Sequence, residues 1–492
     1  MDTVKQRLPV NDDVDSEKAA NAPMLKRRMG MWMGAAVIFN STVGSGIFVS
    51  AGTVVKDSGS IGVALLIWIL NGVLVAFGSM MYIELGCMLP KAGGDYEYIL
   101  QSLGHYFAFL FCYTRVLLII PSGLAIGGLT FSEYLLSTAF PCQIGSASKI
   151  LIGCCILLLF AFLNCWSSKA VDYLQLGFAA GKTLALIGIV ITGFYSLIAA
   201  DGTEYFKNAF EGTRSVSSVM TAFYGCSFAY SGWNYLNLIT EEISDPTRNL
   251  KRAAILAVTG VASLYVFTNV AYFSSMDKAT VISSPAIAVE MMSRYHPSLG
   301  IVVSILVSAS IFGSMNSIIY TTARLVFGAA RKRQMPEALS FLHWDRLTPI
   351  NSIVLVTLAS IVYLFIGDIS ILLYMTTFCE SFFYVITFLG FMYLRLVKPD
   401  WERPYRAPMW AAIIFGIATT AICIFGIIQE TSSMLACIVF MAAGAFIYFL
   451  CRKPFSDDAR RFIAKLYYLL QTIAFTGVSP DPDKALYGSK NN

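Results

Sequence analysis

Charged side chains are scarce in this sequence of 492 residues. Asp, Glu, Lys and Arg together make up 13% of it, whereas hydrophobic residues make up 57%. A soluble globular domain has about 25% charged residues, so the composition excludes that class of protein. The mean hydropathy of +0.66 agrees with this. The composition is typical of a membrane protein, whose first partner is the lipid bilayer.

Histidine is also rare, and its scarcity argues against an enzyme. The three histidines, His105, His296 and His343, are expected near loops, and none has the spacing of metal ligands. The GSG run at residues 44–46 lacks the third glycine and the strand of a nucleotide-binding motif. The net charge of +5 is spread over short loops, unlike a nucleic-acid footprint. We predict no catalytic residue, metal, cofactor or nucleic-acid partner.

Long apolar stretches are what the sequence has in abundance. A membrane-spanning helix needs about 20 mainly apolar residues. Twelve such spans are expected, at about residues 31–54, 61–88, 105–134, 149–166, 172–198, 216–240, 252–275, 299–328, 350–366, 369–394, 409–428 and 433–451. Because every backbone polar group in lipid must be bonded within the protein, these segments predict one all-α, polytopic bundle.

Basic residues predict the orientation of this bundle. Counted from a cytosolic N-terminus, the inner loops contain most of the Lys and Arg, including KRR at 26–28 and RKR at 331–333. Cytoplasmic loops are enriched in these residues, so both termini are expected in the cytosol. Residues 1–28 are polar and predict a disordered cytosolic tail, without a cleavable signal, and residues 455–492 predict a second cytosolic tail.

The outer loops lack N-glycosylation sequons but contain one notable cysteine. The N-x-[ST] pattern occurs once, at residues 40–42 inside the first span, so the chain should carry no N-glycan of its own. Ten of the eleven cysteines fall in or at the ends of spans, and Cys142 lies alone in an outer loop. A lone cysteine on the oxidising side indicates a disulfide to another chain; the alternative is a free thiol without a role.

Two spans contain residues that disfavour a continuous helix. The GSG run at 44–46 lies near the middle of the first span, and FAYSGW at 228–233 lies in the sixth. Such breaks are tolerated only where they line a cavity or are buried in protein. If spans 1–5 and 6–10 are two inverted halves, the breaks correspond, which is typical of a transporter's midplane site. The alternative is that the glycines permit close helix packing.

The two breaks offer opposite backbone dipoles to a ligand. A half-helix that begins at Gly46 directs free N–H groups into the cavity, which suits a carboxylate. A half-helix that ends before Ser231 leaves carbonyls for an ammonium. The residues expected to bind the carboxylate are Ser45, Gly46 and Ile47, and those expected to bind the ammonium are Phe228, Ala229 and Ser231. The pair suits a zwitterionic α-amino acid.

At these residues the chain resembles the L-type amino-acid exchangers, which are light chains of heteromeric amino-acid transporters. These belong to the amino acid–polyamine–organocation superfamily, which has the LeuT-like fold. The resemblance covers about residues 30–450 and rests on GSGIFVS (44–50), AGGDYEY (92–98), FAYSGWNYLNLITEEISDP (228–246), NSIIYTTARLVFGAARKRQMP (316–336) and ERPYRAP (402–408). It implies a 5+5 inverted repeat, with spans 1–5 in residues 29–198, spans 6–10 in 199–396 and spans 11–12 in 397–454.

The resemblance also implies an activity and a partner. It implies sodium-independent, obligatory exchange of amino acids at the plasma membrane, with Cys142 linked to a single-span glycoprotein heavy chain. Asn234 matches a polar position beside the substrate, and Lys182 matches a lysine that takes the place of a sodium ion. Alternatively, Lys182 extends to the inner membrane surface.

Departures from the family bear on the substrate. Members that take cationic amino acids carry Asp where Ser231 stands, so neutral amino acids are favoured. Phe228 and its apolar neighbours favour medium or large side chains. Glu380, at membrane depth in span 10, is an acid where the L-type branch is uncharged. Three roles are open for Glu380: an ion pair with Arg115, the determination of substrate specificity, and proton coupling. The competing functions are a proton-coupled amino-acid or polyamine carrier and an amino-acid sensor that does not transport.

Overall fold

The structure is a computed structural model that describes residues 29–91, 93–139, 145–166, 168–199, 202–331, 334–343, 348–429, 431–451 and 476–478. Cys142, the predicted link to another chain, lies outside the described residues. The predicted tail at 1–28 and nearly all of the predicted tail at 455–492 also lie outside them.

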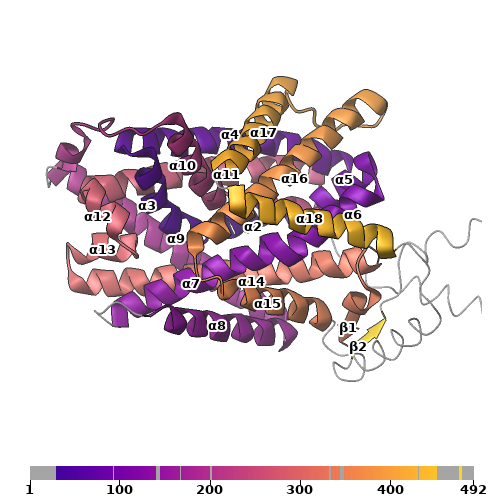
Figure 1. The fold of residues 1–492 in the computed structure, drawn as a ribbon, viewed down its shortest axis with the longest axis horizontal. Helices are drawn as coiled ribbons and strands as arrows, with labels where there is room; N and C mark the ends of the chain where they lie inside the picture. Colours follow the sequence, from indigo (N-terminus) through magenta and orange to yellow (C-terminus); the bar gives the residue numbers. More distant parts are fainter. Residues whose placement is uncertain are drawn as a thin grey trace, which may run out of the picture.

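The described chain is mainly helical, and its long helices run side by side in one bundle (Figure 1). The first α-helices are α2 (Met31–Thr42), α3 (Gly46–Ser58), α4 (Ile61–Met88), α5 (Asp95–Leu103), α6 (His105–Thr114), α7 (Ile120–Ala139), α8 (Ser146–Trp166) and α9 (Ser168–Ala199). The later ones are α10 (Val216–Ala229), α11 (Pro246–Ser275), α12 (Lys278–Ser283), α13 (Ile287–Ser293), α14 (Pro297–Arg331), α15 (Ile350–Leu364), α16 (Ile369–Val397), α17 (Met409–Gln429) and α18 (Thr431–Cys451).

Short helical turns and one strand pair complete the described elements. A π-helical turn, η1 (Arg115–Ile119), joins α6 to α7. The 3-10 helices are η2 (Gly202–Phe206), η3 (Tyr235–Glu242) and η4 (Glu337–Ser340). Strand β1 (Phe341–His343) pairs antiparallel with β2 (Thr476–Val478).

The helices are those of a multi-pass membrane protein. In the described residues, nine helical stretches are long and apolar enough to cross a membrane, and the bent pair α2 and α3 adds a tenth. Helices α10 and α15 are apolar but have only 14 and 15 residues. The described elements fall in all twelve predicted ranges, but two of them are shorter than the length a span needs. Twelve spans therefore remain a prediction.

Side-chain burial agrees with a lipid environment. Outward-facing positions carry exposed apolar side chains, including Leu151, Ile191 and Leu396, the last of which is 76% exposed. Large exposed apolar surfaces mark contact with membranes or partners. In the interior, polar side chains bond to one another across helices, as when Asn164 on α8 donates to Asn316 on α14 at 2.6 Å.

The packing of the long helices places two helix interruptions inside the bundle, which we call the first and the second break. Helix α11 packs against α2, α4 and α9, and α14 packs against α7 and α9. Helices α2 and α3 are bent by 50° at the break between Thr42 and Gly46. Helix α10 ends at Ala229, and the rest of the predicted sixth span consists of turns and the 3-10 helix η3.

Candidate functional site

Two glycines bring the breaks into contact. A Cβ added at Gly46 would lie 2.5 Å from the Cα of Ala229 in the other break. Gly232 has a φ of 94°, and a Cβ added there would lie 2.7 Å from the carbonyl oxygen of Ser41. Real Cβ atoms do not approach so closely, so any side chain at either position would separate the breaks.

A single tyrosine joins the ends of both interrupted helices. Tyr265 of α11 is fully buried, and its hydroxyl lies 2.9 Å from the carbonyl oxygen of Thr42 and 3.0 Å from that of Ala229. These are the last residues of α2 and α10, whose terminal carbonyls have no partner within their own helices. The Ala229 carbonyl, predicted to bind an ammonium, thus lies within hydrogen-bond distance of a protein hydroxyl.

Lys182 lies at the C-terminal end of α2. Its Nζ donates to the carbonyl oxygen of Val43 at 2.8 Å and to that of Asn40 at 3.1 Å. The side chain is 1% exposed, so it is enclosed by protein and does not extend to the membrane surface. A buried ammonium needs oxygen partners, and the negative end of the helix dipole adds a favourable interaction.

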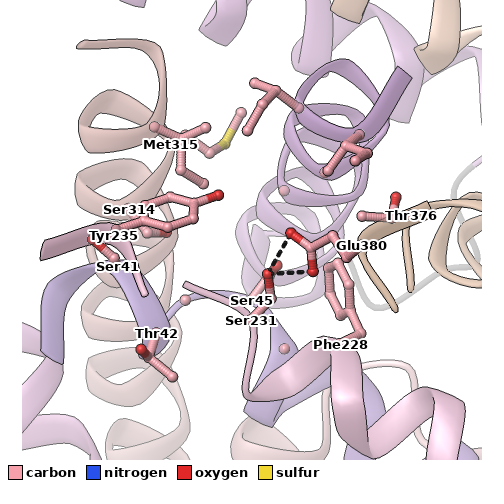
Figure 2. A pocket seen from close by; sticks show the side chains of 17 residues that line it. Ser41, Thr42, Ser45, Phe228, Ser231, Tyr235, Ser314, Met315, Thr376 and Glu380 are labelled. Atoms are coloured by element: carbon pink, nitrogen blue, oxygen red, sulfur yellow. Dashed lines mark hydrogen bonds between the residues drawn. The ribbon is translucent and has the colours of Figure 1, made fainter. Parts of the chain in front are cut away.

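A cavity lies beside the breaks, as Figure 2 shows. Its wall consists of Ser41, Thr42, Gly44, Ser45 and Gly46 from the first break, Phe228, Ser231 and Tyr235 from the second, Ile119, Ile120, Gly123 and Gly127 from η1 and α7, Ser314, Met315 and Ile318 from α14, and Thr376 and Glu380 from α16. Of the predicted substrate-binding residues, the wall includes Ser45, Gly46, Phe228 and Ser231 and does not include Ile47, Ala229 or Asn234.

The start of α3, which reaches the cavity wall at Gly46, has backbone donors without a partner in the helix. The first hydrogen bonds of the helix run from the amides of Phe48 and Val49 to the carbonyl of Ser45, at 3.1 Å and 3.0 Å. The preceding amides, of Gly46 and Ile47, have no partner within the helix because of helix geometry. A helix N-terminus with such amides favours an anion.

Glu380 introduces a carboxylate into the cavity wall. Its two oxygens lie 2.9 Å and 2.8 Å from the hydroxyl of Ser231, and Figure 2 shows the carboxylate directed into the cavity. The side chain is 6% exposed. The sequence indicated an acid at membrane depth but not its contact with Ser231, because 149 residues separate the two.

Arg115 is close to Glu380 but is not in contact with it. Its guanidinium lies over the ring of Tyr235, 5.0 Å from the centroid, and over Phe111 at 5.6 Å. Among the residues that the structure describes, no ion pair of 4.0 Å or less joins Arg115 to an acid. It still acts electrostatically on Glu380 and on Asp95. The geometry does not support a direct Glu380–Arg115 pair.

Asn234 serves a second buried acid. It donates to Asp95 at 2.9 Å, and the same carboxylate accepts from Thr387 at 3.2 Å and from Tyr82. These bonds fix the turn after α10 to α4, α5 and α16. The motif AGGDYEY contains Asp95, but no local pattern could reveal that its carboxylate binds the second break.

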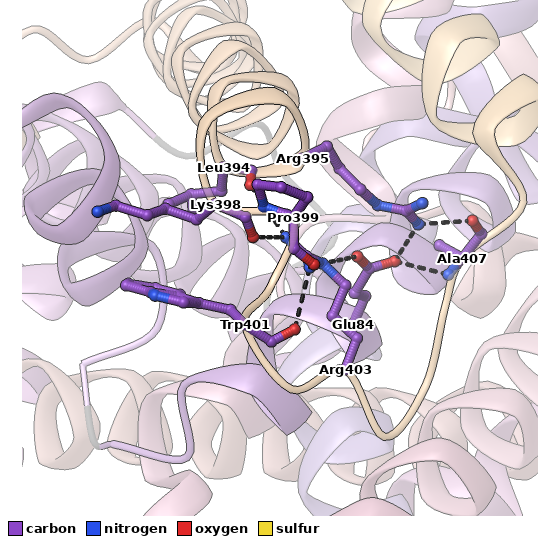
Figure 3. Close-up of polar contacts among 8 residues, drawn as sticks. All are labelled: Glu84, Leu394, Arg395, Lys398, Pro399, Trp401, Arg403 and Ala407. Atoms are coloured by element: carbon purple, nitrogen blue, oxygen red, sulfur yellow. Dashed lines mark hydrogen bonds and ion pairs between the residues drawn. The ribbon is translucent and has the colours of Figure 1, made fainter.

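A third buried acid, which is not in the cavity wall, connects several elements of the bundle (Figure 3). Glu84 of α4 accepts from Arg395 of α16 and from the amide of Ala407 at 2.6 Å, and Arg403 Nε lies 3.4 Å from its other oxygen. Arg403 also donates to the carbonyls of Leu394 and Lys398 at the end of α16. Glu84 thus joins α4, α16 and the loop before α17.

The comparisons with known proteins agree with this architecture. The family model described as amino acid permease matches residues 29–446. The chain is 35% identical to the Asc-type amino acid transporter 1 of Mus musculus over 466 residues, which cover 92% of this chain and 88% of that protein. It is 35% identical to the large neutral amino acids transporter small subunit 2 of Homo sapiens, covering 87% and 80% respectively.

A third relative is similar over a comparable length. The b(0,+)-type amino acid transporter 1 of Mus musculus is 33% identical over 444 residues, which cover 89% of this chain and 91% of that protein. The family and these relatives are permeases and transporters rather than enzymes. The family predicted from the sequence motifs is therefore confirmed: the chain belongs to the amino acid permease family, among the relatives of the L-type amino-acid transporters.

Proposed function

We propose that this protein is a sodium-independent antiporter that exchanges neutral L-amino acids across the plasma membrane by alternating access. The observation that carries the proposal is the contact of two interrupted helices beside one cavity. The amides at the start of α3 supply a site for the substrate carboxylate, with Ser45 and Gly46 in the cavity wall. Carbonyls near Phe228 and Ser231, after the end of α10, supply a site for the ammonium.

The chemistry of the cavity wall supports medium or large neutral side chains. Ile119, Ile120, Met315 and Ile318 form an apolar part of the wall, and Phe228 adds an aromatic ring. Apolar pockets with a few placed polar groups are typical of small-molecule sites. The name of one relative, a large neutral amino acids transporter small subunit, supports the same class of substrate.

Lys182 supports transport without sodium. Its ammonium binds the carbonyls of Asn40 and Val43 at the first break, which gives a fixed positive charge where a coupling cation would otherwise lie. In the proposed architecture the chain has twelve spans, with spans 1–5 in residues 29–198 and spans 6–10 in 199–396 as inverted repeats. Both termini are cytosolic, and Cys142 forms the disulfide to a glycoprotein heavy chain.

Counterflow in proteoliposomes tests the exchange. We expect radiolabelled leucine loaded inside to leave only when an amino acid is present outside, at the same rate in sodium and in choline buffer. Equal efflux into buffer without amino acids would exclude antiport, and dependence on a sodium gradient would exclude the role given to Lys182.

The position of Glu380 in the cavity wall favours one rival, a proton-coupled carrier of amino acids or polyamines. A pH-sensitive dye inside the same vesicles separates the two. The rival requires acidification of the lumen during net uptake of leucine or putrescine, whereas strict exchange requires none. Absence of any flux would leave the sensor alternative.

A further inference from the structure

We infer that the cavity also binds amino acids with a cationic side chain, and that Glu380 is the counter-ion for that side chain. This inference rests on the proposed function and extends its substrate class. It starts from the contact between Glu380 and Ser231, which brings a carboxylate to a position where the sequence indicated only a neutral hydroxyl.

The hydrogen bonds to Glu380 leave acceptor capacity unused. A carboxylate has two oxygens with about four lone-pair positions. Ser231 has a single hydroxyl hydrogen to share between the two oxygens, which lie 2.9 Å and 2.8 Å away. A buried carboxylate with one donor gains most from a ligand that supplies further N–H donors and a positive charge.

Among the described residues, the fixed cations near the cavity make no direct contact with Glu380. The guanidinium of Arg115 lies against the rings of Tyr235 and Phe111 and forms no ion pair of 4.0 Å or less with a described acid. The ammonium of Lys182 donates to the carbonyls at the first break. Neither supplies a direct hydrogen bond to Glu380 in the described part of the chain, so a substrate can supply it.

The wall around Glu380 suits an alkyl chain that ends in a cation. Ile119 and Ile120 provide apolar surface in the same cavity, and Glu380 projects into it from α16 (Figure 2). Lysine and ornithine have methylene chains that pack on such surface while the terminal ammonium bonds to an acid. With a neutral substrate, the hydroxyl of Ser231 remains the donor to Glu380.

Competition in proteoliposomes tests this inference. Uptake of radiolabelled leucine into leucine-loaded vesicles is measured against increasing unlabelled lysine or unlabelled phenylalanine. We expect Glu380→Gln to weaken lysine relative to phenylalanine by about tenfold or more, the effect of losing a charge-assisted hydrogen bond. Glu380→Asp should preserve more of the lysine competition than Glu380→Gln. Glu290→Gln, an exposed acid on α13, is the matched control.

The wild-type protein gives a test that needs no variant. If lysine replaces leucine in the exchange, each cycle moves one positive charge, so a potassium diffusion potential, negative inside, should accelerate lysine uptake into leucine-loaded vesicles. Failure of lysine to compete, or an unchanged lysine-to-phenylalanine ratio in Glu380→Gln, would overturn the inference. Absence of leucine-for-leucine exchange would instead overturn the proposed function.

Discussion

At the scale of single residues, Gly46, which has no side chain, and the side chain of Lys182 allow the two breaks to meet. Gly46 lies against the backbone of Ala229. Lys182 donates hydrogen bonds to carbonyls that have no partner within α2. Neither interaction depends on a ligand. Substitutions at these positions should therefore change stability as well as transport.

Gly46→Ala should damage the protein through its added methyl group. The new Cβ would lie 2.5 Å from the Cα of Ala229, and overpacking of this kind costs about 1–3 kcal/mol. We expect a lower unfolding temperature in detergent and a loss of leucine exchange. Gly260→Ala is the matched control, because a Cβ at Gly260 would meet nothing within 4 Å. Equal behaviour of both variants would contradict the close contact of the breaks.

Lys182→Met should remove two hydrogen bonds while keeping most of the side-chain volume. The carbonyls of Asn40 and Val43 would lose their charged donor, and each unsatisfied buried group costs about 1–3 kcal/mol. We expect reduced thermal stability and slower leucine counterflow. Lys56→Met, at an exposed position of α3, should behave as wild type. A fully active Lys182→Met variant would show that the ammonium is not needed at the break.

At the scale of elements, residues that disfavour a helix coincide with the ends of α2 and α10, but the contacts between these ends have no signal in the sequence. The GSG and SGW runs combine residues that disfavour a helix in lipid, and α2 ends at Thr42 and α10 at Ala229, shortly before them. Two interrupted spans in a twelve-span bundle remain a prediction. The 3-10 helix η3 does not follow from local composition, because its residues continue an apolar segment in the sequence. The Glu380–Ser231 and Asp95–Asn234 contacts join residues 149 and 139 positions apart, and no local signal specifies them.

Tyr265→Phe tests the connection between α2 and α10. The change removes the hydroxyl that lies at hydrogen-bond distance from the carbonyls of Thr42 and Ala229, at a cost of about 0.5–1.5 kcal/mol for one hydrogen bond. We expect slower exchange with a small loss of stability. Tyr272→Phe on the same helix is the control, since its buried hydroxyl has no hydrogen-bond partner in the described structure. Similar exchange rates in the two variants would argue against this connection.

At the scale of the whole molecule, the buried acid Glu84 connects α4 to α16 and to the loop after α16. These segments are distant from α4 in sequence but adjacent to it in the bundle. Breaking a buried, hydrogen-bonded ion pair by removing one partner costs about 3–5 kcal/mol. Glu84→Gln should therefore lower the unfolding temperature much more than Glu204→Gln, which affects an exposed pair with Lys207. Equal unfolding temperatures for the two variants would show that this connection does not stabilise the bundle.

The hydroxyl of Tyr265 has one hydrogen and two carbonyl neighbours, one at the end of α2 and one at the end of α10. At any moment it can donate fully to only one of them. If one of these helix ends moved away during the proposed exchange, the hydrogen could be donated to the carbonyl of the other. Tyr265 would thereby keep one of the two interrupted helix ends hydrogen-bonded in either arrangement of the proposed exchange cycle.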